Sequence, residues 1–293
     1  GGNIFKEKVL ASSYVINGFG KSMGLIQVEE LGTIETPIIM TNTLSIGTVA
    51  NGLIKYMLEQ NEDIGKTTGT VNCVITECND GYLNDIRGLH VKEEHVFEAI
   101  NKAEVIFEEG SVGSGTGMSC YGLKGGIGSS SRIIELDNKE YTLGALVMSN
   151  FGNKGDLIIN KNNVGINLEY LNKIDLTEKE KGSIIIVIAT DIPLSERQLK
   201  RLSKRAIIGL GRTGSHLGNG SGDICITFTT ANKIMHYSST NIIDIKIVDD
   251  NMMDIIFRAL IESVEESVIS SLLHSKTTIG RDGNERKSLT EFI

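Results

Sequence analysis

The stretch Gly218-Asn-Gly-Ser-Gly-Asp-Ile-Cys-Ile-Thr-Phe-Thr229 sets a serine between two glycines, directly before an apolar run typical of a strand. Glycine neighbours leave the Ser221 hydroxyl unhindered and the backbone around it flexible. Ser221 Oγ could therefore attack the Gly220 carbonyl in an N→O acyl shift, and water would hydrolyse the resulting ester. The cut would free the Ser221 α-amine, whose reference pKa of about 7.7–8 suits a base for its own hydroxyl near neutral pH. Gly220–Ser221 is thus a candidate self-cleavage junction, with Ser221 as nucleophile.

Two other interpretations of this stretch are open. A Gly-Ser-Gly tripeptide also occurs in ordinary surface loops. A conventional Ser/His/Asp hydrolase would draw on His216 or His236, which lie near Ser221 in the sequence. That class, however, uses a Gly-x-Ser-x-Gly elbow between a strand and a helix, and the glycines around Ser221 are out of that register. The pattern therefore favours self-cleavage over a triad.

Apolar periodicity predicts an α/β protein. Alternating or continuous apolar runs predict strands over 34–40, 71–76, 141–148, 183–189, 224–229 and 242–248. A 3.6-residue period predicts helices over 46–60, 92–107, 195–208 and 251–274. Ser195 and Gln198 have the spacing of a capping box at the start of the third helix. Because no linker, charge block or internal repeat divides the chain, residues 1–293 are expected to form one domain.

Glycine-rich segments raise the question of a nucleotide site. Gly209-Leu-Gly-Arg-Thr-Gly214 matches the dinucleotide fingerprint in letters, but that fingerprint requires a strand before it and a helix after it. Here a predicted helix precedes the glycines, so the context is wrong. The segments 113–117 and 124–128 lack the closing Gly-Lys-Ser/Thr of a phosphate loop. They indicate either tight turns between closely packed backbones or a wall of N–H groups beside an active site.

Composition excludes several classes of protein. The net charge of −8 argues against nucleic-acid binding, which needs clustered Lys and Arg. The longest apolar run, 184–189, is too short to span a membrane, and charged residues interrupt 5–15, so no signal peptide is expected. The four cysteines and five histidines show no metal-ligand spacing, which indicates free thiols, a cytoplasmic protein and no metal or cofactor.

Asn219-Gly-Ser-Gly-Asp223 before a strand resembles the self-cleavage junction of the L-aminopeptidase/D-Ala-esterase/amidase family, which includes the β-peptidyl aminopeptidases. Further segments resemble the same family in the same order and extend the resemblance over nearly the whole chain. They are Glu29-Glu-Leu-Gly32, Thr41-Asn-Thr43, Asn79-Asp-Gly81 with Leu83-Asn-Asp-Ile86, 113–118, Cys120-Tyr-Gly-Leu-Lys-Gly-Gly-Ile-Gly128, Ser131-Arg132, Asn150-Phe-Gly152 and Ala189-Thr-Asp-Ile-Pro-Leu194.

The resemblance implies a four-layer αββα sandwich, processed into a larger subunit, 1–220, and a smaller subunit, 221–293, that stay together. It implies a metal-independent hydrolase that releases N-terminal residues from small peptides, amides and esters. A homo-oligomer, a tetramer of processed pairs, is likewise implied. Members of the family usually carry a further N-terminal segment of strands, so the sheet edge and oligomer contacts of a chain starting at Gly1 are in doubt. The alternative is an uncleaved, non-catalytic relative that binds small molecules.

The resemblance also assigns roles to residues. Ser221 corresponds to the nucleophile, and Tyr121 to the tyrosine beside the oxyanion. An oxyanion also needs an amide-type donor, and Asn150 at the end of a predicted strand is the candidate. Asp191 is less suitable because a carboxylate repels developing negative charge.

A Ser-x-Glu pattern of the family fits Ser263-Val-Glu265 in the last predicted helix. By resemblance, Ser263 orients the nucleophile and Glu265 holds the amine. Residues two apart do not share a helix face, so both reach Ser221 only if the helix bends or starts locally. Glu262 and Glu266 are therefore alternatives to Glu265.

Overall fold

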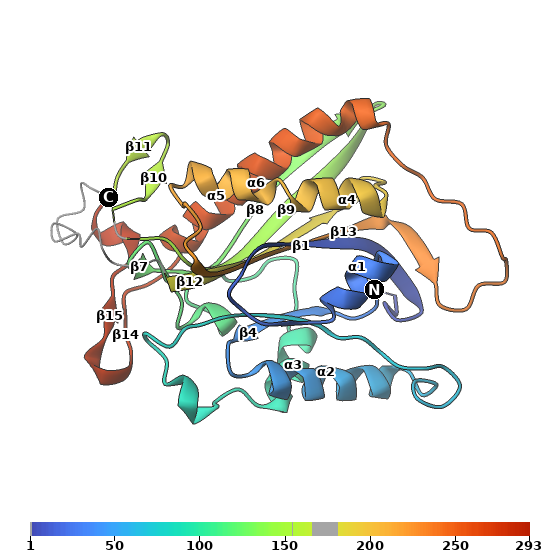
Figure 1. The fold of residues 1–293 in the computed structure, drawn as a ribbon, viewed down its shortest axis with the longest axis horizontal. Coiled ribbons are helices and arrows are strands. Elements are labelled where there is room, and N and C mark those ends of the chain that lie inside the picture. Colours follow the sequence, from blue (N-terminus) through green and yellow to red (C-terminus); the bar gives the residue numbers. More distant parts are fainter. Residues whose placement is uncertain (1, 154, 166–180) are drawn as a thin grey trace.

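A computed structural model describes residues 2–153, 155–165 and 181–293 (Figure 1). Its centre is a six-stranded sheet in which β12 and β13 are parallel and all other neighbours are antiparallel. In sheet order the strands are β3 (Thr33–Ile34), β1 (Glu7–Gly18), β13 (Gly220–Met235), β12 (Lys181–Thr190), β9 (Lys139–Asn150) and β8 (Gly126–Leu136).

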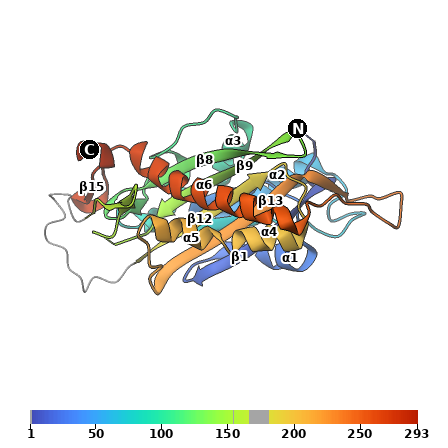
Figure 2. The ribbon, with the colours of Figure 1, turned by 90° about the horizontal axis from the view of Figure 1, so that it is seen from above.

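A second, three-stranded sheet packs against the first. It consists of β2 (Ser22–Met23), β5 (Val74–Cys78) and β4 (Ile38–Asn42) in that order. Figures 1 and 2 show α4 (Glu196–Ser203), α5 (Ala206–Arg212) and α6 (Met253–Leu273) over the outer face of the large sheet. On the opposite side of the molecule, α2 (Ile46–Gln60) and α3 (Glu93–Asn101) cover the small sheet. The predicted αββα sandwich is thus confirmed.

Three hydrophobic cores separate the four layers. β12 shows how one strand serves two of them: Ile184, Ile186 and Ile188 pack against the helices, whereas Ile185 packs between the two sheets. A strand covered on both faces needs a continuous apolar run, and this is what made β12 recognisable in the sequence. The third core lies between the small sheet and α2, where Leu53 is fully buried.

The remaining elements are short. They are α1 (Leu25–Leu31), β6 (Ser119–Cys120), β7 (Leu123–Lys124), β10 (Ile158–Ile159), β11 (Asn162–Asn163), β14 (Thr278–Ile279) and β15 (Glu285–Arg286).

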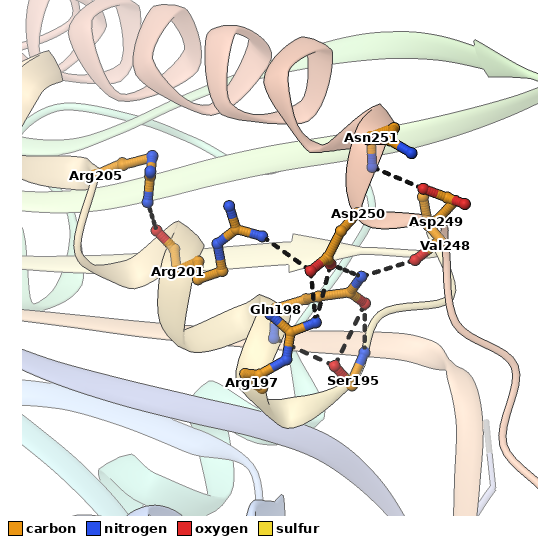
Figure 3. A network of polar contacts seen from close by, with 9 residues as sticks. All are labelled: Ser195, Arg197, Gln198, Arg201, Arg205, Val248, Asp249, Asp250 and Asn251. Atoms are coloured by element: carbon orange, nitrogen blue, oxygen red, sulfur yellow. Dashed lines mark hydrogen bonds and ion pairs between the residues drawn. The ribbon is translucent and has the colours of Figure 1, made fainter.

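A network of polar contacts fixes the start of α6 against α4 (Figure 3). Gln198 Nε2 donates to Val248 O and to Asp250 Oδ1, each at 2.7 Å. Asp250 also forms an ion pair with Arg197, with 2.8 Å between Oδ2 and Nη2. Ser195 and Gln198 form the predicted capping box. The network ties the segment that leads into α6 to α4.

Several predicted elements need correction. The strand over 34–40 is two strands, β3 and β4, because Pro37 between them has no N–H for the sheet. The helix over 195–208 is also two, α4 and α5, and the helix over 92–107 ends at Asn101. β1 and β8 were not predicted from the sequence.

The strand predicted over 242–248 is wrong. This segment is irregular, and Ile242, Ile243, Ile245 and Ile247 are 45–82% exposed. In the part of the chain that the structure describes, it pairs with no strand, and its alternating isoleucines therefore do not form a sheet. Among the described residues no helix has the length and apolar character needed to cross a membrane.

Candidate active site

The Gly220–Ser221 bond lies at the head of β13, in the middle of the large sheet. Ser221 pairs with Gly182 of β12, and the next residue, Gly222, pairs with Gly18 of β1. A turn precedes the strand, because Ser221 N donates to Gly218 O at 2.9 Å. A turn therefore holds the backbone before the scissile bond, and the sheet holds the backbone after it.

The Asn17 side chain fastens the backbone around the junction. Asn17 Nδ2 lies 3.0 Å from Gly218 O and 2.5 Å from Ser221 O. It therefore contacts carbonyls on both sides of Gly220. Asn17 was not predicted as a site residue, and no local signal pointed to it, because 204 positions separate Asn17 from Ser221.

The Ser221 hydroxyl is bound to a carboxylate. Ser221 Oγ donates to Asp223 Oδ1 at 2.6 Å, and both residues are fully buried. Residues two apart on a strand project to the same face, so β13 itself places these side chains together. Asp223 was part of the junction motif but received no role, although the strand period predicts this neighbour.

A second buried acid, Glu77, lies beside the junction. A side chain at Gly20 would meet Glu77 Oε1 and Gly222 Cα, each at 3.4 Å, so glycine lets these segments approach. Glu77 Oε1 accepts from Lys21 N at 2.9 Å, and the Glu77 side chain is 2% exposed. Its Oε2 has no hydrogen-bond partner among the described residues. Sequence reasoning missed Glu77.

Tyr121 lies between β6 and β7, fully buried, with a left-handed backbone at φ 51°. Its hydroxyl lies 2.8 Å from Thr213 Oγ1. Thr213 Oγ1 itself donates to Leu210 O, so Tyr121 is the donor in the pair. Thr213 is the first residue of the junction loop, 213–220, and Tyr121 therefore anchors the segment that leads to Ser221. Ser221 has no hydrogen bond with Tyr121 in the described part of the chain.

Asn150 ends β9 and joins two loops through its amide. Its Oδ1 accepts from Ser119 N at 2.8 Å, and its Nδ2 donates to Asn79 O at 3.0 Å. Asn150 and Gly222 both pair with Ser183 of β12, so they lie two strand spacings apart, about 10 Å. The second Nδ2 hydrogen is the one that an oxyanion could use.

Ser263 and Glu265 form no hydrogen bond or ion pair with Ser221 among the described residues. Ser263 is fully buried on α6, and its Oγ has no hydrogen-bond partner among the described residues. Glu265 forms an ion pair with Arg212 at the end of α5, with 3.1 Å between Oε2 and Nη1. The alternatives, Glu262 and Glu266, both bind Arg132 of β8.

The register of α6 on the sheet shows which serine of this helix lies level with the junction. Ser271 Oγ lies 2.6 Å from Ser149 Oγ, and Ser149 belongs to the same strand row as Ile184 and Asp223. Ser263 lies two turns earlier, about 12 Å along the helix axis. Ser271 is therefore the α6 serine that is level with the junction.

The glycine-rich segments lie where backbones pack closely: residues 113–115 form a short 3₁₀ helix, and residues 124–128 lead from β7 into β8. A side chain at Gly126 would lie 2.0 Å from Gly110 O, and one at Gly125 would lie 2.4 Å from Ser149 O. The apparent dinucleotide fingerprint falls largely on α5, where Gly209 packs against Val264 of α6. That segment therefore has a helix-packing role, as its wrong context indicated.

The Lys124 side chain binds backbone carbonyls of both glycine-rich segments from the protein interior. It is fully buried, and its Nζ donates to Gly115 O, Met118 O and Gly125 O at 2.9, 2.9 and 2.6 Å. Burial disfavours the charged amine and lowers the pKa of Lys124 to about 7, against a small opposite effect of Asp80.

Lys124→Met should lower the free energy of unfolding by about 3 kcal/mol, because three buried carbonyls lose their donor. It should also remove a pH dependence. The unfolded chain holds the Lys124 proton up to about pH 10.5 and the folded chain only up to about pH 7. Wild-type stability therefore gains up to about 1.4 kcal/mol per pH unit across this window from Lys124 alone.

Urea unfolding at pH 7, 8 and 9 measures this difference, since other titrating groups are shared by both proteins. Lys102→Met, which changes an exposed lysine, is the control. Parallel pH profiles of wild type and Lys124→Met would contradict the prediction.

In the described residues no group of three or more His, Cys, Asp or Glu side chains could hold a metal ion, and all four cysteines are buried free thiols. Two cavities, of about 670 and 520 Å³, lie on the side of the small sheet, and Ser221 lines neither.

The chain matches peptidase family S58 over residues 1–286. The β-peptidyl aminopeptidase BapA of Sphingosinicella microcystinivorans is 38% identical over 280 residues, which are 91% of this chain and 70% of that protein.

Solved structures agree. The crystal structure of the PH0078 protein from Pyrococcus horikoshii OT3 has a TM-score of 0.93 at 57% identity, covering 98% of this chain and 79% of that one. The L-aminopeptidase D-Ala-esterase/amidase of Ochrobactrum anthropi, a prototype for the serine aminopeptidases with a variant Ntn hydrolase fold, has a TM-score of 0.89 at 35% identity. It covers 97% of this chain and 78% of that one. The resemblance first drawn from the junction motif is therefore confirmed: the chain belongs to peptidase family S58 and is a hydrolase of the aminopeptidase and amidase class.

Proposed function

We propose that the chain cuts itself between Gly220 and Ser221, and that the freed Ser221 then serves as an N-terminal nucleophile. The observation that carries the proposal is the position of Ser221: at the head of a central strand, next to a turn, with its hydroxyl bound to the Asp223 carboxylate. The products are the subunits 1–220 and 221–293. The substrates are small peptides, amides and esters, from which the N-terminal residue is released.

In turnover, the α-amine of Ser221 takes the hydroxyl proton while Oγ attacks the substrate carbonyl. A neutral amine with a reference pKa of about 7.7–8 can do this near neutral pH. Oγ and the amine belong to one residue, so no histidine is needed to bring base and nucleophile together. The ester between substrate and Ser221 is then hydrolysed by water, with the amine again as proton carrier.

Turnover should require the cut, for two reasons. Before the cut the Ser221 nitrogen is an amide, which is no base. Ser221 is also fully buried in the continuous chain, and it lines neither cavity. A substrate therefore has no route to Oγ until the junction loop, 213–220, moves away.

Donors for the oxyanion are Tyr121 and Asn150 in this proposal. Each is buried at the end of the large sheet that carries Ser221, and each is a hydrogen-bond donor. Tyr121 would have to exchange Thr213 for the substrate oxygen. Ser263 and Glu265 are assigned by resemblance alone, as orienting group and amine holder.

Two further features of the proposal are the compartment and the assembly. Four buried free thiols suit a reducing cytoplasm. A homo-oligomer, a tetramer of processed pairs, follows the family resemblance.

Intact mass spectrometry of the purified protein tests self-cleavage. Two fragments separated between Gly220 and Ser221 are expected after incubation at neutral pH, in place of the 31.8 kDa chain. A single 31.8 kDa species that hydrolyses no peptide p-nitroanilide would support the alternative, an uncleaved protein that binds small molecules. A cut at another bond would also overturn the assignment of Ser221.

A further inference from the structure

The first cut needs a base other than the one used in turnover. In the continuous chain the Ser221 nitrogen is part of the Gly220 peptide bond, and it donates its hydrogen to Gly218 O. An amide nitrogen in this state has no lone pair available for a proton. The self-processing proposed above, on which this inference rests, therefore requires another group to take the proton from Oγ.

Asp223 is in place to do so. Its Oδ1 accepts the Ser221 Oγ hydrogen bond at 2.6 Å, and neither residue is exposed to solvent. Within the described residues this is the only hydrogen bond of Ser221 Oγ. Because β13 pairs on both sides, with β1 and with β12, the two side chains are held by a rigid strand rather than by a loop.

The histidines nearest in sequence are directed elsewhere. His216 Nδ1 lies 3.6 Å from Asp156 Oδ2. His236 Nε2 lies 2.8 Å from Thr68 Oγ1, and its ring packs on Phe5 with 4.5 Å between centroids. Asp223 is therefore the group that the geometry offers to Ser221 Oγ.

We propose that Asp223 is the catalytic base of self-cleavage. The Asp223 carboxylate takes the proton of Ser221 Oγ as Oγ bonds to the Gly220 carbonyl carbon. The carboxylic acid then gives that proton to the Ser221 nitrogen as the Gly220–Ser221 C–N bond breaks. The products of this step are an ester between Gly220 and Ser221 Oγ and a free α-amine. Water hydrolyses the ester to the Gly220 carboxylate and the Ser221 hydroxyl, and Asp223 is a carboxylate again.

Self-cleavage and turnover thus use different bases. Asp223 acts once in the life of each molecule, and the α-amine that it helps to release acts in every later cycle. The junction therefore carries its own catalyst for maturation, two residues after the scissile bond.

Asp223→Asn tests the base. Asparagine keeps the shape and can still accept a hydrogen bond from Ser221 Oγ, but it cannot take the proton. Intact mass over time should show cleavage slowed at least about 10²-fold, the usual range for loss of a general base. Asp80→Asn, which changes another buried acid that does not bind Ser221, should cut at the wild-type rate. Equal rates for Asp223→Asn and wild type would overturn the proposal.

Hydroxylamine separates the two chemical steps, because it cleaves esters. If Asp223 drives the acyl shift, the Asp223→Asn chain forms little ester, and hydroxylamine should leave its slow cleavage unchanged. Restoration of the wild-type rate by hydroxylamine would mean that the ester forms without Asp223, and would overturn the proposal.

A cysteine background separates a base from a merely structural carboxylate. A thiol ionises near pH 8.5 without help, so Ser221→Cys depends less on a base. The slowing caused by Asp223→Asn should be at least tenfold smaller in Ser221→Cys than in wild type. Equal slowing in both backgrounds would show a structural role. Asp223→Glu is compared in the same two backgrounds. It keeps a carboxylate and should be cut faster than Asp223→Asn. If Asp223→Asn does not fold, the cleavage rate of Asp223→Glu still tests the proposal.

These outcomes are distinct from failure of the proposed function. If the wild-type chain never separates at Gly220–Ser221, the proposed function itself fails. If the wild type is cut and Asp223→Asn is cut equally fast, self-processing stands and only the role of Asp223 is lost.

Discussion

Ser221→Ala is expected to give a folded chain that stays uncut and has lost peptidase turnover by at least about 10⁴-fold, as for removal of a nucleophile in other serine hydrolases. Alanine removes the hydroxyl oxygen that would act as nucleophile, so neither the acyl shift nor the attack on substrate can begin. Intact mass follows the cut, and hydrolysis of a peptide p-nitroanilide follows turnover.

The same change should have a modest effect on stability. Asp223 Oδ1 loses its donor, and a buried acceptor left without one costs about 1–3 kcal/mol. Ser12→Ala is the matched control: Ser12 is another buried serine, on the neighbouring β1, and its Oγ has no hydrogen-bond partner among the described residues. It should be cut and active like the wild type. Turnover retained by Ser221→Ala would remove Ser221 from the mechanism.

Gly128→Ala should destabilise the fold by about 3 kcal/mol or more, although it adds one methyl group. A side chain at Gly128 would lie 2.1 Å from Ser267 O and 2.5 Å from Ser271 N, both in the backbone of α6. Backbone atoms in a helix cannot rotate away, so α6 must move off β8 as a whole, and its packed core with it. For a chain of this size the expected fall in Tm is roughly 6–12 °C.

Gly144→Ala on the adjacent strand β9 is the matched control. There the nearest atoms, Ala189 O and Ser130 O, are both 3.9 Å from the added carbon, which is an ordinary contact. Neither glycine has a positive φ, so the two substitutions differ in space alone. Thermal unfolding of both variants measures the effect. Equal melting temperatures would mean that the space between α6 and β8 at Gly128 can accept a methyl group, and would contradict the prediction.

Elements with strong local signals could be predicted from the sequence. The helix over 46–60 was predicted to the residue, because its apolar period is complete and its packing needs no knowledge of the partner. The apolar run 184–189 likewise identified β12. The segment 242–248 shows the limit: its alternating isoleucines have the period of a strand, but a strand exists only beside another strand, and local sequence does not state the partner.

The residues of the candidate site also differ in how far local sequence could identify them. The candidate junction and Ser221 were proposed from one short motif, and the strand period could have shown that Asp223 faces Ser221. Asn17 and Glu77 could not be found, because each reaches the junction only through the pairing of distant strands. The Ser-x-Glu assignment on α6 stays a prediction for a related reason: the pattern gives spacing along a helix, whereas the register of α6 on β9 decides which serine is level with the junction.

β13 would hold the two subunits together after the peptide bond is gone. In the proposed processing, all of this strand except Gly220 would belong to the smaller subunit, whereas both strands beside it, β1 and β12, would belong to the larger one. The smaller subunit would thus be interlocked with the larger, and the two could separate only by unfolding. Before the cut, refolding is a unimolecular event. After the cut, a molecule that unfolds must meet a partner fragment again, so recovery depends on concentration, and the lifetime of the mature enzyme is set by how slowly the sheet opens.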